Sequence, residues 1–332
     1  PANRCNTLGR RLFMRVPLPA AMMTTSRGGW WGAVSGLVED ADMKVFSGFL
    51  RIIGLCVACL LLTSCSLVKL GYGQLPDLTY WWIDAYIDLT DAQTPRLRRE
   101  IDELIAWHRG TELPQLVLLL QKAQRLAPDP ISPAQVCTLV EDARTRFNAV
   151  TARSENLVLW LAPSLSPAQI EHLARQFAKS NKEWEADWLN GTPADQLKHR
   201  VKQATRRFEM IYGDLDEAQI QLLRAGLAGS SFDARLWRSE RLRRQDDMLA
   251  TLRRVSAGNL PPETIRESMQ ALLDRLITPS GPAGRAYAET MQRENCALFS
   301  RIHNSTSAAQ RTRAVATLRG YEDDFRALST PR

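Results

Sequence analysis

The feature that most constrains the fold is a short sequence that recurs along the chain. It consists of an aliphatic residue, then Ser, Thr or Asp, then two residues and a glutamine. The side-chain oxygen of the second residue accepts a hydrogen bond from a backbone amide of the first helical turn, and the glutamine reaches back to the capping amide. Each copy therefore predicts a helix N-terminus. Strong copies place these at Thr90, Ser132, Ser166 and Asp216, and weaker ones lie at 260–265 and 307–310.

Helical periodicity follows these starts. Pro133 and Pro167 occupy the first helical position, where a missing N–H is tolerated, and Thr192-Pro193 predicts a further start. Apolar residues then recur every three or four positions, which is typical of amphipathic helices with one buried stripe. After Ser132 these positions are Val136, Leu139, Val140, Ala143, Phe147, Val150 and Leu157. No alternating strand pattern appears. The sequence predicts an all-α, multi-helix bundle of about nine or ten amphipathic helices over residues 78–330, with a weak subdomain boundary near residue 229, where Gly229 begins a short linker.

A second feature, at residues 43–65, indicates where the chain is processed. Lys44 and Arg51 supply positive charge before an uncharged, mostly apolar run from Ile52 to Leu62. This run is too short to cross a bilayer core of about 30 Å as a helix, but it suits a secretory signal. The alternative is a buried helix that contains an ordinary cysteine.

The residues after this run, Leu62-Thr63-Ser64-Cys65, resemble the lipobox of bacterial lipoproteins. The resemblance implies that residues 43–64 are a signal peptide, that cleavage occurs before Cys65, and that Cys65 receives the lipid. Several acyl chains on Cys65 would hold the protein on a membrane. Ser66 follows the cysteine and favours the outer membrane, facing the periplasm.

The segments on either side of the signal carry less information. Residues 1–42 lack helical periodicity, and we interpret them as sequence upstream of a start at Met43 or as a disordered extension. Residues 65–77 contain Gly71, Gly73 and Pro76 and are predicted to form the lipidated tether.

Charge and cysteine content depend on this processing. The formal net charge of +7 falls to +3 for residues 65–332, because most of the excess of basic residues precedes Cys65. This small excess does not favour a nucleic-acid partner. Cys137 and Cys296 remain as an even pair, which would form a disulfide in an oxidising compartment. The alternative is two buried thiols.

An aromatic segment follows the predicted tether. On a helix over residues 78–89, one face contains Leu78, Trp82, Ala85 and Leu89, and another contains Tyr80, Asp84 and Asp88. The functional interpretation of this segment is a membrane-proximal aromatic anchor or a ligand platform. The alternative is an aromatic-rich core helix. Together with Asp91, the two aspartates could bind a cation or act as catalytic carboxylates, or they could form a solvated helix face.

The sequence Trp107-His108-Arg109, with Glu112 close by, is predicted to end the helix that begins at Thr90. A histidine at this position suits either an acid–base or ligand site or a simple C-terminal cap. The candidate partner surface therefore comprises Trp81, Asp84, Asp88, Trp107, His108, Arg109 and Glu112. No histidine spacing for zinc on one helix, phosphate loop or G-x-S-x-G motif occurs, so no catalytic, metal or cofactor site is predicted.

Two basic segments cover residues 198–207 and 235–244. The almost wholly polar stretch from Ser239 to Asp247 is expected to be the least buried helical part of the chain. It could meet anionic lipid head groups or an acidic partner, or it could be a solvated face with interleaved acids.

Three segments near the lipobox resemble an uncharacterised family of proteobacterial lipoproteins, a domain of unknown function. They are Tyr80–Tyr86, Trp107–Arg109 and Glu112–Pro114. This resemblance implies a helical envelope protein and no activity. Separately, the Leu-Ser/Thr-x-x-Gln sequences resemble a motif of small periplasmic helical stress proteins and chaperones.

Our main hypothesis is a non-enzymatic lipoprotein that binds or scaffolds an envelope protein or peptidoglycan. One alternative is a chaperone-like binder of unfolded envelope proteins. The other is an enzyme acting on peptidoglycan or glycans through Asp84, Asp88, His108 or Glu112.

Overall fold

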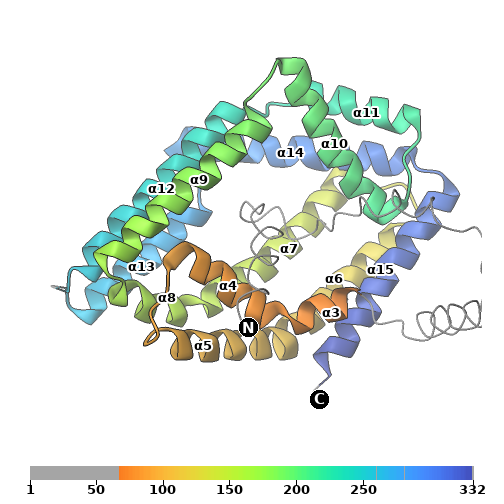
Figure 1. Ribbon diagram of the computed structural model, residues 1–332. Helices are drawn as coiled ribbons and strands as arrows, with labels where there is room; N and C mark the ends of the chain where they lie inside the picture. The colour runs from red at the N-terminus through yellow and green to blue at the C-terminus, as the bar shows by residue number, and fades with distance from the viewer. Residues whose placement is uncertain (1–66, 259, 280, 331–332) are drawn as a thin grey trace, which may run out of the picture. The chain divides into compact units, whose positions relative to one another are not determined.

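The computed structural model describes residues 67–258, 260–279 and 281–330, which are predominantly helical (Figure 1). Cys65, the signal segment and residues 1–42 lie outside the described residues. The helices are α3 (Leu67–Gly73), α4 (Leu75–Ile87), α5 (Thr94–Trp107), a π-helical turn η1 (His108–Glu112), α6 (Leu113–Leu126), α7 (Pro133–Arg153), α8 (Glu155–Leu161), a 3₁₀ turn η2 (Ala162–Ser164), α9 (Pro167–Trp188), α10 (Pro193–Tyr212), α11 (Glu217–Ala228), α12 (Ala234–Ser256), α13 (Pro262–Ile277), α14 (Gly281–Ser305) and α15 (Ala308–Ser329).

The predicted all-α class is confirmed, because the described residues contain helices and no strand. Several helices follow one another almost without a break, such as α5, η1 and α6, and joining such segments gives about ten helical runs. Residues 67–77 form α3 and the first turn of α4 instead of an irregular tether. Residues Leu67–Arg332 form one compact unit.

The predicted helix starts owe their geometry to side-chain caps. Reciprocal capping boxes, in which cap and third residue each bond the other's backbone amide, occur at Ser132, Ser166, Thr192, Asp216 and Ser307. Thr90 and Gln93 make the same two bonds, although α5 itself begins at Thr94. The weak copy at 260–265 differs, since its cap is Pro261 and no side-chain bond is made there.

The capping glutamines also pair with one another. Gln169 Nε2 donates to Gln93 Oε1 at 2.8 Å, and each amide nitrogen also donates to a backbone carbonyl just before the other helix start. Gln219 and Gln310 repeat this arrangement, at 2.8 and 2.9 Å. Each pair therefore joins two helix N-termini that are distant in sequence.

Apolar packing and a disulfide join the helices that lie side by side in Figure 1, among them α6 with α15, α7 with α14, and α9 with α12. The largest buried cluster includes Leu161, Ile170, Val255, Met269 and Leu272. Cys137 on α7 and Cys296 on α14 form a disulfide with their Cα atoms 5.5 Å apart.

The expected single buried stripe of α7 is incomplete. Val136 is buried, whereas Val140 and Phe147 are 45% and 47% exposed. The helix contacts α14 near its start, so residues further along have fewer apolar neighbours to cover them.

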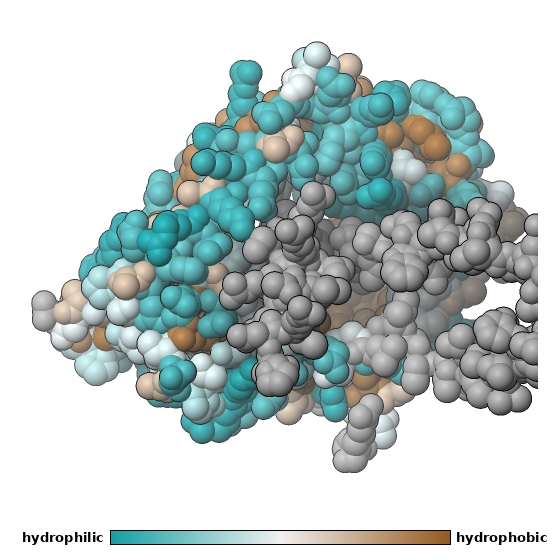
Figure 2. All heavy atoms as spheres, in the orientation of Figure 1, coloured by the Kyte–Doolittle hydropathy of each residue, from teal (hydrophilic) through white to brown (hydrophobic). Residues whose placement is uncertain are grey.

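The polar stretch of α12 is not the least buried helical part of the chain, because α9 and α12 share a polar interface. Arg241 Nε donates to Asn181 Oδ1 at 2.6 Å, and the amides of Asn181 and Gln245 bond reciprocally. Arg238 pairs with Glu185. These bonds leave residues 240–245 half-buried. Figure 2 shows that the visible surface over α9 and α12 is mainly hydrophilic.

Candidate functional site at a π-helical turn

The predicted partner surface separates into two groups. Trp81, Asp84 and Asp88 belong to α4 or its C-terminal cap, whereas Trp107 and the residues after it lie where α5 meets η1.

Helix α5 ends at Trp107, within the predicted segment, but the backbone stays helical beyond it. The chain continues through the π-helical turn η1, in which the amide of Leu113 donates to the carbonyl of His108. Pro114 permits this continuation, because a proline is tolerated in the first turn of α6, where its missing N–H needs no partner. Such π-helical turns within α-helices are frequent at functional sites, so η1 is a candidate site on its backbone geometry alone.

A tyrosine from α3 contacts the first residue of this turn. Tyr72 Oη lies 2.8 Å from His108 Nδ1, and the Arg109 guanidinium lies 5.5 Å from the centre of the Tyr72 ring. Burial lowers the pKa of His108, although the nearby Glu112 acts in the opposite direction. Burial also raises the pKa of Tyr72, against the effect of Arg109. At neutral pH the pair thus consists of a neutral imidazole and a protonated phenol.

The last residue of the turn is a buried carboxylate. Glu112 is 3% exposed, and Arg146 Nη1 from α7 approaches its Oε2 only to 3.7 Å. That separation gives a charge interaction but no hydrogen bond. Among the described residues, neither Glu112 Oε2 nor Arg109 Nε, also buried, has a hydrogen-bond partner.

Unpartnered buried polar atoms are unfavourable and call for an explanation. The cluster of Tyr72, His108, Arg109 and Glu112, named here the η1 cluster, offers one open acceptor and one open donor. A group that both donates and accepts, such as an amide, a hydroxyl or an ordered water, is chemically matched to this pair.

The α4 aspartates have local structural roles. Asp84 Oδ1 accepts a hydrogen bond from the amide of Leu89 at 3.0 Å. Asp88 ends α4 in the left-handed region, with φ of 59°, and its carbonyl accepts from Gln169. Both residues therefore shape the turn between α4 and α5.

The aromatic residues of α4 do not form a core helix, because no residue of α4 is buried. Trp81 is 56% exposed and Trp82 38%.

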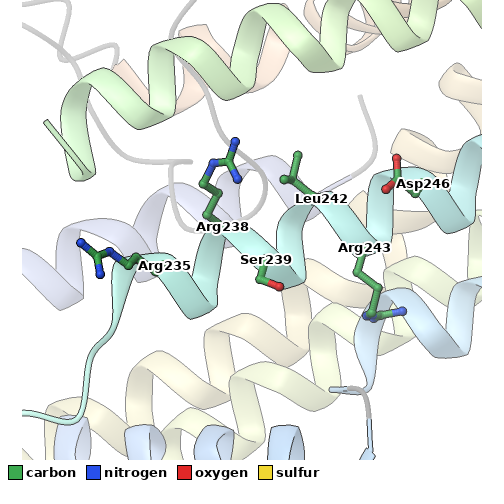
Figure 3. A pocket seen from close by; sticks show the side chains of 6 residues that line it. All are labelled: Arg235, Arg238, Ser239, Leu242, Arg243 and Asp246. Carbon is green, nitrogen blue, oxygen red and sulfur yellow. The ribbon is translucent and has the colours of Figure 1, made fainter.

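A surface hollow lies along α12, and its lining residues come from that one helix (Figure 3): Arg235, Arg238, Ser239, Leu242, Arg243 and Asp246. Figure 3 shows Arg238 and Leu242 pointing to one side of the helix and Arg243 to the other. Arg243 pairs with Glu240 and Arg238 with Glu185. These ion pairs agree with the interpretation that acidic residues offset the basic residues of this segment.

Sequence reasoning missed a second tyrosine–histidine pair. Tyr212 Oη lies 2.8 Å from His303 Nδ1, and His303 Nε2 lies 2.8 Å from the carbonyl oxygen of Asp129. Both side chains are almost inaccessible, at 3% and 1% exposure. Neither pair has a sequence signal, because 36 residues separate Tyr72 from His108 and 91 separate Tyr212 from His303.

The described part of the chain contains neither a metal-binding cluster nor a membrane-spanning helix. Within residues 67–330, apart from the gaps stated above, no group of three or more His, Cys, Asp or Glu residues could hold a metal ion. None of the helices in the same part is both long and apolar enough to cross a membrane.

Comparison with known proteins gives one match. A model of a family of unknown function, DUF6279, matches residues 85–272, which include η1, the Gln93–Gln169 pair and the whole of α9 and α12. No curated protein and no solved structure matches the chain.

Proposed function

Because the chain belongs to the family of unknown function DUF6279, no activity can be transferred to it, and we propose a function from its own residues. The protein is a lipoprotein anchored through Cys65 in the outer membrane and facing the periplasm. Its helical unit, Leu67–Arg332, is a non-enzymatic binding or scaffold protein of the cell envelope. Its partner is an envelope protein or peptidoglycan.

The anchor rests on the sequence of residues 51–65. An arginine, an apolar run, two small residues and Cys65 follow in the order that a lipobox requires. The Cys137–Cys296 disulfide supports the same compartment, since disulfides persist in the periplasm and are rare in the cytosol.

The binding role is carried by the η1 cluster. A fold that leaves a buried carboxylate oxygen and a buried guanidinium nitrogen without hydrogen-bond partners among the described residues suits a site that another molecule completes. We assign recognition to His108, Arg109 and Glu112. A peptide amide or an acetamido sugar would supply both the donor and the acceptor.

The chaperone-like alternative is not carried further. It rested on the Leu-Ser/Thr-x-x-Gln sequences, and their glutamines are engaged in capping boxes and in the Gln93–Gln169 and Gln219–Gln310 pairs. A structural role therefore accounts for these residues.

Photo-crosslinking in cells tests the binding role. A photoreactive residue at Thr111, which is exposed within η1, is expected to capture a reproducible envelope protein or peptidoglycan fragment. The matched control carries the same group at Glu267, exposed on α13. Adding Glu112→Gln should weaken capture from Thr111 while the helical circular dichroism is unchanged. Capture of nothing from Thr111, or of the same species from both positions, would reject the assignment.

A further inference from the structure

Helix α4 presents four uncharged residues on one face, which is bordered by Asp77 and the exposed Asp88. Leu78, Trp81, Trp82 and Ala85 recur at helical spacing along it. Trp81 is 56% exposed and Trp82 38%, although most residues of α4 are apolar. Large aromatic side chains left open together on one helix indicate a surface that contacts something else.

The rest of α4 is held in place by polar and aromatic contacts. Asp77 forms an ion pair with Arg98 of α5 at 2.9 Å, and the same guanidinium lies 3.8 Å from the centre of the Tyr80 ring. On α9, Phe177 packs against Tyr86 with ring centres 6.2 Å apart. Rotating α4 to bury its tryptophans would break these contacts, so the open face is a fixed feature of the fold.

The position of Cys65 limits how far this face can lie from a membrane. Only one residue separates Cys65 from α3, and one residue separates α3 from α4. Seven helical residues span about 10 Å at 1.5 Å each, and the residues on either side add at most about 3.5 Å per residue. The first residue of α4 therefore lies within about 25 Å of Cys65.

We propose that the exposed tryptophan face of α4 lies on the leaflet that holds the Cys65 acyl chains, with Trp81 and Trp82 in the head-group region. This inference rests on the proposed lipid anchor. Tryptophan prefers the membrane–water interface, where its apolar ring and its N–H are both accommodated. Since the four residues of this face are uncharged and no basic residue borders them on α4, the contact needs no anionic lipid and should depend little on salt.

Fluorescence quenching tests this contact on the full lipidated chain. The chain is extracted from membranes, the mass of its Cys65 peptide is measured, and it is reconstituted into phosphatidylcholine vesicles that contain brominated lipids. Trp81→Phe/Trp82→Phe is compared with Trp237→Phe, because Trp237 of α12 is 51% exposed and serves as a matched control. The double variant should lose most of the quenching, the control should keep it, and raised salt should change neither.

The two proposals fail in different ways. Acylated Cys65 with equal quenching in the wild type and the double variant would overturn the α4 inference alone and leave the anchor standing. Such a result would also be expected if a second copy or a protein partner covered the tryptophans. A Cys65 peptide without acyl groups would overturn the anchor, and with it the reason for placing α4 at a membrane.

Discussion

Two tyrosine–histidine pairs with the same 2.8 Å contact between Oη and Nδ1 differ in their surroundings. In the Tyr212–His303 pair, the second imidazole nitrogen contacts the carbonyl of Asp129, and both side chains are almost inaccessible. The Tyr72–His108 pair is half-buried and adjoins two buried polar atoms without partners. The geometry of a pair therefore does not distinguish a structural contact from a candidate site, whereas the completeness of its surroundings does.

Two buried glutamates repeat the contrast. Glu322 of α15 accepts hydrogen bonds from Gln121 and Gln124 of α6 at 2.7 Å each and from Arg326, and these bonds lower its pKa to about 2. Among the described residues, Glu112 Oε2 accepts no hydrogen bond and has a longer charge interaction with Arg146. Mutations at the Tyr212–His303 pair and at Glu322, where the polar groups are paired, are expected mainly to lower stability. Mutations in the η1 cluster are expected mainly to weaken binding.

The largest loss of stability is expected on removing the disulfide, which joins α7 to the helix that carries His303. Cys137→Ala/Cys296→Ala opens a loop of 159 residues and should lower the free energy of unfolding by about 4–5 kcal/mol in the chain-entropy model. Urea unfolding measures this change, and reduction of the wild type provides the control. A loss below about 1 kcal/mol would show that the cross-link does not stabilise this region.

The next largest effect on stability is expected at the two histidines, and it should differ between them. His303→Ala removes a fully buried ring and two hydrogen bonds, which should lower the free energy of unfolding by about 3 kcal/mol. His108→Ala, at a half-buried position, should lower it by about 1 kcal/mol. Equal losses in urea unfolding would remove the distinction between the pairs.

Both histidines should also contribute to acid sensitivity. Burial lowers the pKa of each below its ordinary value of 6.5, so the unfolded chain binds protons that the folded chain does not. Their contribution favours folding at pH 7 and is lost as the pH falls through 6.5 towards the folded pKa. Unfolding between pH 7 and 5 should therefore show a weaker pH dependence in His303→Gln than in the wild type. An unchanged slope would contradict this assignment.

The glutamates give a contrast at lower pH. The stabilisation from ionised Glu322 is present above 4.5 and is lost as the pH falls towards 2, because its folded pKa lies below the ordinary value. Glu322→Gln should reduce the loss of stability over this range. Glu112→Gln serves as the control for substitution of a buried glutamate.

The smallest effect is expected at the contact between α3 and η1. Tyr72→Phe removes one hydrogen bond at a half-buried site and should lower the free energy of unfolding by about 0.5–1 kcal/mol. The same change should alter crosslinking from Thr111, because the imidazole of His108 loses its partner. A stability loss as large as that of His303→Ala would indicate that the Tyr72–His108 pair is structural.

Local sequence rules predicted the helix starts well, because a capping box is complete within four residues. Ser132, Ser166 and Asp216 all cap helices as predicted. The same rules could not predict that Gln93 meets Gln169, since that bond depends on how distant helix starts pack. They also predicted a helix end at Trp107 but not the π-helical turn that follows it. That turn joins α5 to α6 and contacts α7 and α15.

Only part of the candidate site could be predicted from the sequence. His108, Arg109 and Glu112 were singled out, but Tyr72 was assigned to a tether because glycines flank it. Burial of Glu112 without a hydrogen-bond partner for Oε2 is a tertiary property that no local pattern encodes. The lipid on Cys65 stays a prediction of the sequence.

The most direct test of the account is therefore the mature N-terminus itself. Membrane fractionation with mass spectrometry should find a chain that begins at acylated Cys65 in the outer membrane, and Cys65→Ala should abolish both the modification and the membrane association. An unmodified wild-type chain in the cytoplasm would contradict the anchor, the periplasmic partner and the membrane contact of α4 together.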